Sequence, residues 1–311
     1  GTYTIIADLY DNISNVIFSG TGTRVLPNKD LTICNLLRID GPVLDNSVFN
    51  KKLTIQGSMT LVSGSFNSGS GAGATVTFAG AGLQSVGDDT DDYFRGSNAF
   101  NNLEINNSAG LRIGDDGAIE VKGNLLLTSG LINTSDTRKL TIINPAINCV
   151  VPAGGSATSF IDGPLIKRIS QYDNFLFPIG KSGTPDVLGN NIKISSTQAG
   201  PLLWSAEYFT PNPTSGATFI TSPLVGVSAQ EFYTVKTTAA TQATLNLNWT
   251  SSSDVTPVIT GGISNIRLAR YDTGTGKWIE VPTSSTGGDS FGTATSTSFV
   301  TASATGSDDY T

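Results

Sequence analysis

Short triplets of alternating apolar and polar residues recur through the first half of the chain. Each triplet has a period of two, as a minimal β-strand does. Windows with apolar residues at helical spacing are nearly missing, so the sequence predicts an all-β protein. The triplets occupy residues 31–33, 37–39, 53–55, 59–61, 76–78, 103–105, 111–113, 119–121, 125–127 (apolar throughout) and 140–142.

The spacing between equivalent triplets is nearly constant. Leu31 and Leu53 are 22 residues apart, and so are Leu103 and Leu125. A repeat of about 22 residues built from short strands and Gly, Asn and Ser turns is typical of one coil of a parallel β-helix. A stack of antiparallel hairpins is the alternative, but it gives no reason for this period. We therefore expect a parallel β-helix over residues 1–158, with residues 31–33 beside 53–55 and 103–105 beside 125–127.

Longer strands with aromatic residues follow, and they alternate clearly between apolar and polar positions. This pattern, with turn clusters between the strands, predicts an antiparallel β-sandwich over residues 159–311. The expected strands lie near residues 174–177, 191–195, 203–208, 231–235, 243–249, 266–271, 277–281 and 298–300. The expected core contains Trp204, Phe232, Leu245, Leu247, Leu268 and Trp278.

The composition limits the chemistry available to the chain. Only 14% of the residues are charged, the net charge is −7, and there is no histidine. An acidic surface repels nucleic acid and anionic membranes, and the lack of histidine excludes Ser-His-Asp and Cys-His catalysis. No apolar run approaches the 18 residues that a membrane-spanning helix needs. We therefore expect no nucleic-acid partner and no membrane insertion.

The two cysteines, Cys34 and Cys149, are too few and too distant in sequence to indicate a disulfide framework. Cys34 lies in the apolar stretch 31–39, which predicts a small buried side chain rather than a reactive thiol. The chain begins at Gly1 without a basic and apolar leader. This beginning favours a mature or excised fragment.

Four sequence segments resemble large surface proteins of the Bacteroidota, many of which leave the cell by the type IX secretion route. The segments are NNLEINNSAG (101–110), IEVKGNLLLTSG (119–130), GPLIKR (163–168) and FLFPIG (175–180). The resemblance covers roughly residues 98–311. It implies an extracellular or cell-surface location and a role as a stalk, filament body or adhesin segment, and it implies no particular activity.

The acidic run at Asp88, Asp89, Asp91 and Asp92 is the most prominent candidate site in this charge-poor chain. Calcium takes several oxygen ligands from such loops, so these four carboxylates are candidate calcium ligands. A solvated acidic loop is the plainer interpretation, because the spacing is not that of an EF-hand. The neighbouring Tyr93 and Phe94 fit either a sugar-stacking platform or an aromatic anchor for the loop.

Five charged residues in and beside the triplets are those from which an active site could be assembled. Parallel β-helices include polysaccharide lyases and hydrolases, whose grooves gather carboxylates with Lys or Arg. The middle positions of strands normally carry solubilising residues, so we expect no catalytic cluster among them. Glu104, Arg112 and Glu120 occupy such middle positions, and Asp115 and Lys122 are the other two residues of this candidate cluster.

The sequence therefore favours a non-catalytic, extracellular structural or adhesive segment of a larger surface protein or filament. Its expected partners are a cell-surface or polysaccharide ligand, or further copies of itself, and calcium is the one cofactor that the sequence suggests. The alternative is a carbohydrate-binding or carbohydrate-cleaving β-helix protein. A concave groove that holds two carboxylates with a Lys or Arg would favour the alternative.

Overall fold

The structure is a computed structural model that describes residues 1–4, 12–87, 94–115, 117–183, 192–251, 253–302 and 308–311. About 51% of the chain is strand and 5% is helix, so the prediction of an all-β protein is confirmed. By its internal contacts the chain divides into two compact units. The N-terminal unit contains residues 1–144 and 149–162, and the C-terminal unit contains residues 145–148 and 163–311.

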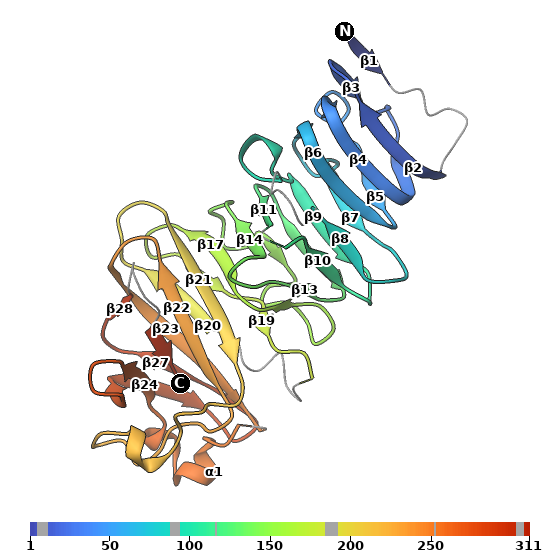
Figure 1. Cartoon of the computed structure of the whole chain (residues 1–311). Helices are drawn as coiled ribbons and strands as arrows, with labels where there is room; N and C mark the ends of the chain where they lie inside the picture. The colour runs from blue at the N-terminus through green and yellow to red at the C-terminus, as the bar shows by residue number, and fades with distance from the viewer. Residues whose placement is uncertain (5–11, 88–93, 116, 184–191, 252, 303–307) are drawn as a thin grey trace. The chain divides into compact units, whose positions relative to one another are not determined.

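The N-terminal unit is a parallel β-solenoid of about seven turns, as predicted. Successive coils lie side by side in Figure 1. Its elements are β1 (Thr2–Thr4), β2 (Asn12–Ser19), β3 (Thr23–Val25), β4 (Leu31–Asp45), β5 (Leu53–Ile55), β6 (Ser58–Asn67), β7 (Thr75–Phe78), β8 (Gln84–Val86), the 3-10 turn η1 (Gly96–Asn98), β9 (Asn102–Asn106), β10 (Leu111–Ile113), β11 (Ala118–Val121), β12 (Leu125–Ser129), β13 (Ile132–Asn133), β14 (Lys139–Ile142), β15 (Val150–Val151) and β16 (Ile161–Asp162).

One face of the solenoid, which we call the first face, consists of the start of β4 followed by β5, β7, β9, β12 and β15. All of these neighbours are parallel, and both predicted pairings, 31–33 with 53–55 and 103–105 with 125–127, are confirmed. The coil that separates β7 from β9 is longer than the others, because it includes residues 88–93 and η1. The inward register of the face runs Leu31, Leu53, Val76, Leu103, Leu125, Val150.

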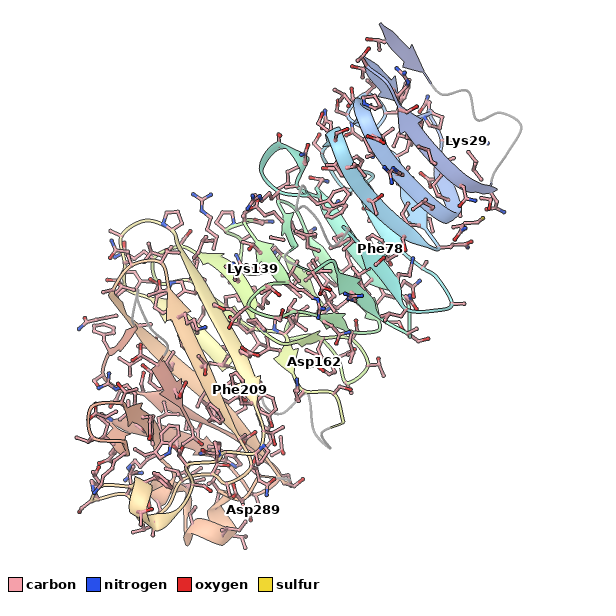
Figure 2. The ribbon with its side chains drawn as sticks, viewed as in Figure 1. Lys29, Phe78, Lys139, Asp162, Phe209 and Asp289 are labelled. Carbon is pink, nitrogen blue, oxygen red and sulfur yellow. The ribbon has the colours of Figure 1, made fainter. Side chains whose placement is uncertain are left out.

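The interior of the solenoid is mainly apolar, with a few buried polar side chains such as Gln84, whose Nε2 donates to the Ile55 carbonyl at 2.9 Å. Ile55, Phe78 (labelled in Figure 2) and Ile105 are all completely buried and occupy equivalent positions in successive coils. Burial of such side chains contributes about 1.5–3 kcal/mol each to folding. Cys34 was predicted to be buried, but its side chain is only half-buried. Within β4 the alternation of buried and outward residues is interrupted at this point, and the next residue, Asn35, is exposed.

The C-terminal unit contains two antiparallel sheets. The first has the order β17–β21–β22–β29–β24–β25, and the second has the order β18–β20–β23–β27–β26, with β28 also on β23. The elements are β17 (Leu165–Ile169), β18 (Asn174–Leu176), β19 (Ile179–Gly180), β20 (Ile192–Ser196), β21 (Leu202–Phe209), η2 (Ala217–Phe219), β22 (Phe232–Thr237), β23 (Thr241–Thr250), α1 (Pro257–Thr260), η3 (Ile263–Asn265), β24 (Leu268–Asp272), β25 (Lys277–Val281), β26 (Thr283–Gly287), β27 (Phe291–Ser296), β28 (Val300–Ala302) and β29 (Asp308–Tyr310).

Five of the six predicted core residues of this unit are buried, and one is not. Trp204, Leu245, Leu247, Leu268 and Trp278 are buried. Phe232 is half-buried and stacks on Phe209, with ring centroids 5.0 Å apart. The alternation of β22 explains the difference, because it directs Tyr233 and Val235 inward and leaves Phe232 on the opposite face.

Candidate functional site

The four candidate calcium ligands, Asp88, Asp89, Asp91 and Asp92, lie outside the described residues, and so does Tyr93. Within the described ranges there is no group of three or more His, Cys, Asp or Glu side chains placed to hold a metal ion. The calcium site stays a prediction from the sequence.

Phe94 is an interior residue of the solenoid. Its side chain is buried and stacks on Phe100, with ring centroids 5.0 Å apart and the rings nearly parallel. Phe66 meets both rings edge-on. Phe94 therefore anchors the end of its loop in the core and is not available as a sugar-stacking surface.

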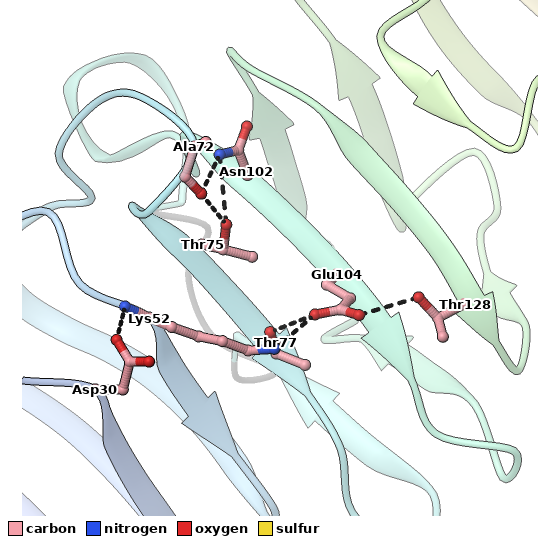
Figure 3. Close-up of polar contacts among 8 residues, drawn as sticks. All are labelled: Asp30, Lys52, Ala72, Thr75, Thr77, Asn102, Glu104 and Thr128. Atoms are coloured by element: carbon pink, nitrogen blue, oxygen red, sulfur yellow. Dashed lines mark hydrogen bonds and ion pairs between the residues drawn. The ribbon is translucent and has the colours of Figure 1, made fainter.

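Glu104 is the centre of a polar cluster on the outer side of the first face (Figure 3). Its Oε2 accepts hydrogen bonds from Lys52 Nζ at 3.0 Å and from Thr77 Oγ1 at 2.8 Å, and its Oε1 accepts one from Thr128 Oγ1 at 3.0 Å. Burial alone raises the pKa of Glu104, but the hydrogen bonds from Lys52, Thr77 and Thr128 lower it below its ordinary value of 4.5. Glu104 is thus an ionised carboxylate held by three donors, which suits coil-to-coil bracing better than proton transfer.

The structure records side-chain partners for three of the other four charged residues that the sequence offered for a catalytic cluster. Arg112 Nη2 donates to Asp115 Oδ2 at 2.7 Å, and Arg138 donates to Asp115 Oδ1. Glu120 Oε2 accepts the Gly96 N–H at 2.7 Å. The structure thus brings Arg112 and Asp115 together. No described contact gathers the five residues into one catalytic group.

The C-terminal unit contains a groove of about 580 Å³, a volume within the range of about 300–1,000 Å³ that is common for ligand sites. The loop 223–228 forms one wall, the segment 254–267 forms another, and Ala269, Glu280 and Thr311 complete the lining. Two lining side chains, Val225 and Ile259, are 98% and 62% exposed. Exposed aliphatic residues that border one hollow mark a surface suited to binding.

The charged groups of the groove are already held by protein partners. Arg267 Nε lies 3.0 Å from Glu280 Oε1. Asp254 accepts hydrogen bonds from Ser228 Oγ at 2.7 Å and from the Ala229 N–H at 2.8 Å. The groove does contain two carboxylates and an arginine, but it lies in the C-terminal unit, and these contacts leave it an aliphatic cleft with a polar rim.

Sequence reasoning missed this groove. Its aliphatic residues lie in segments rich in Pro, Gly and Thr, where no strand or helix period marks them as one surface. The only available signal was the presence of several aliphatic residues in two segments that otherwise look like turns.

Comparison with family models, with curated proteins and with solved structures finds no match for this chain. In the part of the chain that the structure describes, no helix is long and apolar enough to cross a membrane.

Proposed function

We propose that this chain is a non-catalytic extracellular structural or adhesive segment of a larger cell-surface protein or filament. The observation that carries the proposal is the unbroken inward ladder of the first face, from Leu31 to Val150. Because each coil is hydrogen-bonded to the next along this ladder, the coils form one continuous, rigid stack. The resemblance to Bacteroidota surface proteins supports the extracellular location.

The outer side of the first face supports a role without turnover. Its middle positions include Thr32, Thr54 and Thr77, which are paired in register across three coils. Glu104 is the next residue in this row, and its carboxylate forms an ion pair with Lys52. On this face the half-buried Thr32 and Thr54 carry hydroxyl groups suited to contact with a polysaccharide, a cell-surface ligand or another copy of the chain, whereas the Thr77 hydroxyl is buried and donates to Glu104.

The two sheets of the C-terminal unit, on this proposal, pack face to face as a β-sandwich. A cavity of about 40 Å³ supports this arrangement, because residues of both sheets line it. Tyr233 and Leu268 come from the first sheet, and Leu247, Trp249 and Ala294 come from the second.

A panel of neutral and acidic polysaccharides tests the absence of turnover. We expect the purified chain to release no reducing or unsaturated ends, and binding without cleavage would identify the adhesive ligand. Cleavage that disappears when Asp88, Asp89, Asp91 and Asp92 are replaced together by Asn would instead establish the alternative, a carbohydrate-cleaving β-helix.

Single-molecule stretching tests the structural role. A coil of 22 residues extends by about 80 Å when it detaches, at about 3.6 Å per residue. Because each coil contacts mainly its neighbours, we expect force peaks at multiples of this increment. Unfolding of the N-terminal unit without resistance would contradict the proposal.

A further inference from the structure

The second sheet of the C-terminal unit has one buried side and one outward side. Along β23 the side chains of Leu245, Leu247 and Trp249 are buried, whereas Asn246 and Asn248, which alternate with them, are half-buried. Residues directly opposite each other in an antiparallel pair point to the same side, so the registers of the sheet identify the other outward residues. The outward face, as we call this set, consists of Asn174, Leu176, Lys193, Ser195, Thr244, Asn246, Asn248, Ser284, Thr286, Phe291, Thr293 and Thr295.

The outward face is continuous across the sheet from β18 to β26. One row of directly opposite residues runs Leu176, Lys193, Asn246, Thr295, Ser284. A second row runs Asn248, Thr293, Thr286. Adjacent strands are about 4.8 Å apart, so the four spacings of the first row cover about 19 Å. A surface of this length suits an extended chain of sugar residues better than one small molecule.

Amide and hydroxyl groups dominate the outward face, and Lys193 is the single charged residue in the set. Exposed positions of folded proteins more often hold Lys, Glu, Arg and Asp. On the first sheet, by contrast, Glu207 and Asp309 are opposite Thr234 on its two sides, and Asp309 Oδ1 accepts a hydrogen bond from Thr234 Oγ1 at 2.7 Å. The low charge is therefore a property of the outward face of the second sheet.

Hydrogen bonds within the outward face orient its polar groups. Asn246 Nδ2 donates to Thr295 Oγ1 at 2.6 Å, and the hydroxyl oxygens of Thr286 and Thr293 are 3.2 Å apart. A side-chain amide has two donor hydrogens and an acceptor oxygen, and a hydroxyl group both donates and accepts. These side chains thus keep further donors and acceptors for the hydroxyl groups of a ligand.

Phe291 adds an aromatic surface beside the two rows. It is the next outward residue of β27 after Thr293, and its side chain is 53% exposed. An aromatic ring can pack against the C–H groups of a sugar ring. The centres of protein–protein interfaces are instead enriched in Tyr, Trp, Met and Arg, none of which occurs among the residues of the outward face. A neutral polyhydroxyl ligand therefore fits this face better than a protein does.

We propose that the outward face binds a neutral polysaccharide chain that lies across the strands. Its amide and hydroxyl groups hydrogen-bond to the sugar hydroxyls, and Phe291 packs on a sugar ring. An acidic polysaccharide is disfavoured, because the chain has a net charge of −7 and Lys193 alone is positive on this face. This site rests on the adhesive form of the proposed function, and it gives that function a location in the C-terminal unit and a ligand class.

Affinity electrophoresis of the intact chain in native gels tests the proposal. The neutral probes are mixed-linkage β-glucan, xyloglucan, galactomannan and dextran, and the acidic probes are polygalacturonate and alginate. We expect at least one neutral polysaccharide to retard the chain in a saturable manner and neither acidic one to do so. Retardation by no neutral probe, or equally strong retardation by an acidic probe, would overturn the proposal.

Two exposed apolar residues provide a matched pair of variants. Phe291 belongs to the outward face, whereas Leu83, which is 61% exposed, belongs to the N-terminal unit. Phe291→Ala should weaken binding of the retarding polysaccharide by roughly 10-fold, and Leu83→Ala should leave it within about 2-fold. Because both side chains are exposed, both variants are expected to fold, and their melting temperatures check this. An equal effect of the two substitutions would contradict the site.

The amide groups are tested by a second pair of variants. Asn246→Ala combined with Asn248→Ala should weaken binding by at least roughly 10-fold, because it removes two hydrogen-bonding side chains. Ser205→Ala combined with Glu207→Ala makes the same kind of change at alternate half-buried positions of β21 in the first sheet, and it should leave binding within about 2-fold. Equal binding by these two double variants, at equal melting temperatures, would overturn the location of the site.

The outcomes separate this site from the proposed function. If a neutral polysaccharide binds the unmodified chain and every variant equally, the adhesive function stands and the outward face is the wrong site. If no neutral polysaccharide binds but stretching gives the expected force peaks, the structural role stands and the glycan site is wrong. A concentration-dependent dimer that Phe291→Ala abolishes would show instead that the outward face contacts a second copy of this chain.

Discussion

Lys52 Nζ lies 3.0 Å from Glu104 Oε2, although the two residues are 52 positions apart in the sequence. Lys52 directly precedes β5, and Glu104 belongs to β9, so the contact passes over the coil of β7 (Figure 3). Thr77 in that intervening coil donates to the same carboxylate, and Thr128 donates from the coil of β12. One carboxylate thus braces four successive coils.

Replacement of Glu104 by Gln should destabilise the protein in a pH-dependent manner. The hydrogen bonds hold the pKa of Glu104 below its unfolded-state value near 4.5. A lowered folded-state pKa means that the carboxylate stabilises the protein above pH 4.5 and that this stabilisation is lost as the pH falls through the folded-state pKa. We expect Glu104→Gln to cost about 1–2 kcal/mol at pH 7 and progressively less as the pH falls through the folded-state pKa, measured by urea unfolding.

A double-mutant cycle with Lys52→Met separates the ion pair from the rest of the cluster. The side chain of Glu104 is only 16% exposed, so the pair is less screened than a surface ion pair. A coupling free energy of about 0.5–1 kcal/mol is expected. Additive effects would show that Thr77 and Thr128, and not Lys52, account for the stabilisation by Glu104.

Ile55→Asp should unfold the solenoid, whereas Thr54→Asp should be tolerated. Ile55 is completely buried between Ile33 and Phe78 of the adjacent coils, and Thr54 is the outward, half-buried residue beside it. An unpaired carboxylate in this interior costs about 3–5 kcal/mol, and a surface substitution costs about 0.5 kcal/mol. Circular dichroism during thermal melting measures both. Similar melting of the two variants would show that the inward assignment is wrong.

The solenoid was predictable because both of its regularities, the alternation within each triplet and the period between triplets, can be recognised in the sequence without knowledge of distant contacts. Each triplet shows which side chains point inward, and the 22-residue period shows which triplets are neighbours. Val76 and Leu103 are 27 residues apart and depart from this period, yet the two residues still pair in the register of the ladder.

The C-terminal unit was less predictable, because its strands depend on distant partners. The hairpin of β26 and β27 was missed: the sequence TSSTG of β26 has no apolar residue, and its strand conformation depends on pairing with β27. The groove was missed for a related reason. Val225 and Ile259 are in segments without regular alternation, and the fold alone brings them to one hollow.

Gly130→Ala should destabilise the protein more than Gly71→Ala. Both glycines have positive φ, +90° and +73°, so an alanine at either position is strained by about 1 kcal/mol. At Gly130 a Cβ atom would also lie 1.7 Å from the carbonyl oxygen of Asn107 in the preceding coil, whereas nothing lies within 4 Å at Gly71. We expect costs of about 3 and about 1 kcal/mol in urea unfolding. Equal costs would mean that the coils separate at Gly130 without penalty.

Calcium should stabilise the chain if the acidic run at Asp88, Asp89, Asp91 and Asp92 binds it. A ligand that binds only the folded state adds RT ln(1 + [L]/Kd) to the free energy of unfolding, or about 2.7 kcal/mol at 100 times the dissociation constant. The melting temperature should therefore rise steadily with the logarithm of calcium concentration above that constant.

Differential scanning fluorimetry from chelator to millimolar calcium measures the rise, and magnesium at the same concentrations controls for screening of the net charge of −7. Asp89→Asn combined with Asp91→Asn should abolish the calcium effect and leave the melting temperature in chelator no lower, because the substitutions relieve repulsion between neighbouring carboxylates. A melting temperature that does not change with calcium in the unmodified chain would leave the solvated acidic loop as the correct interpretation.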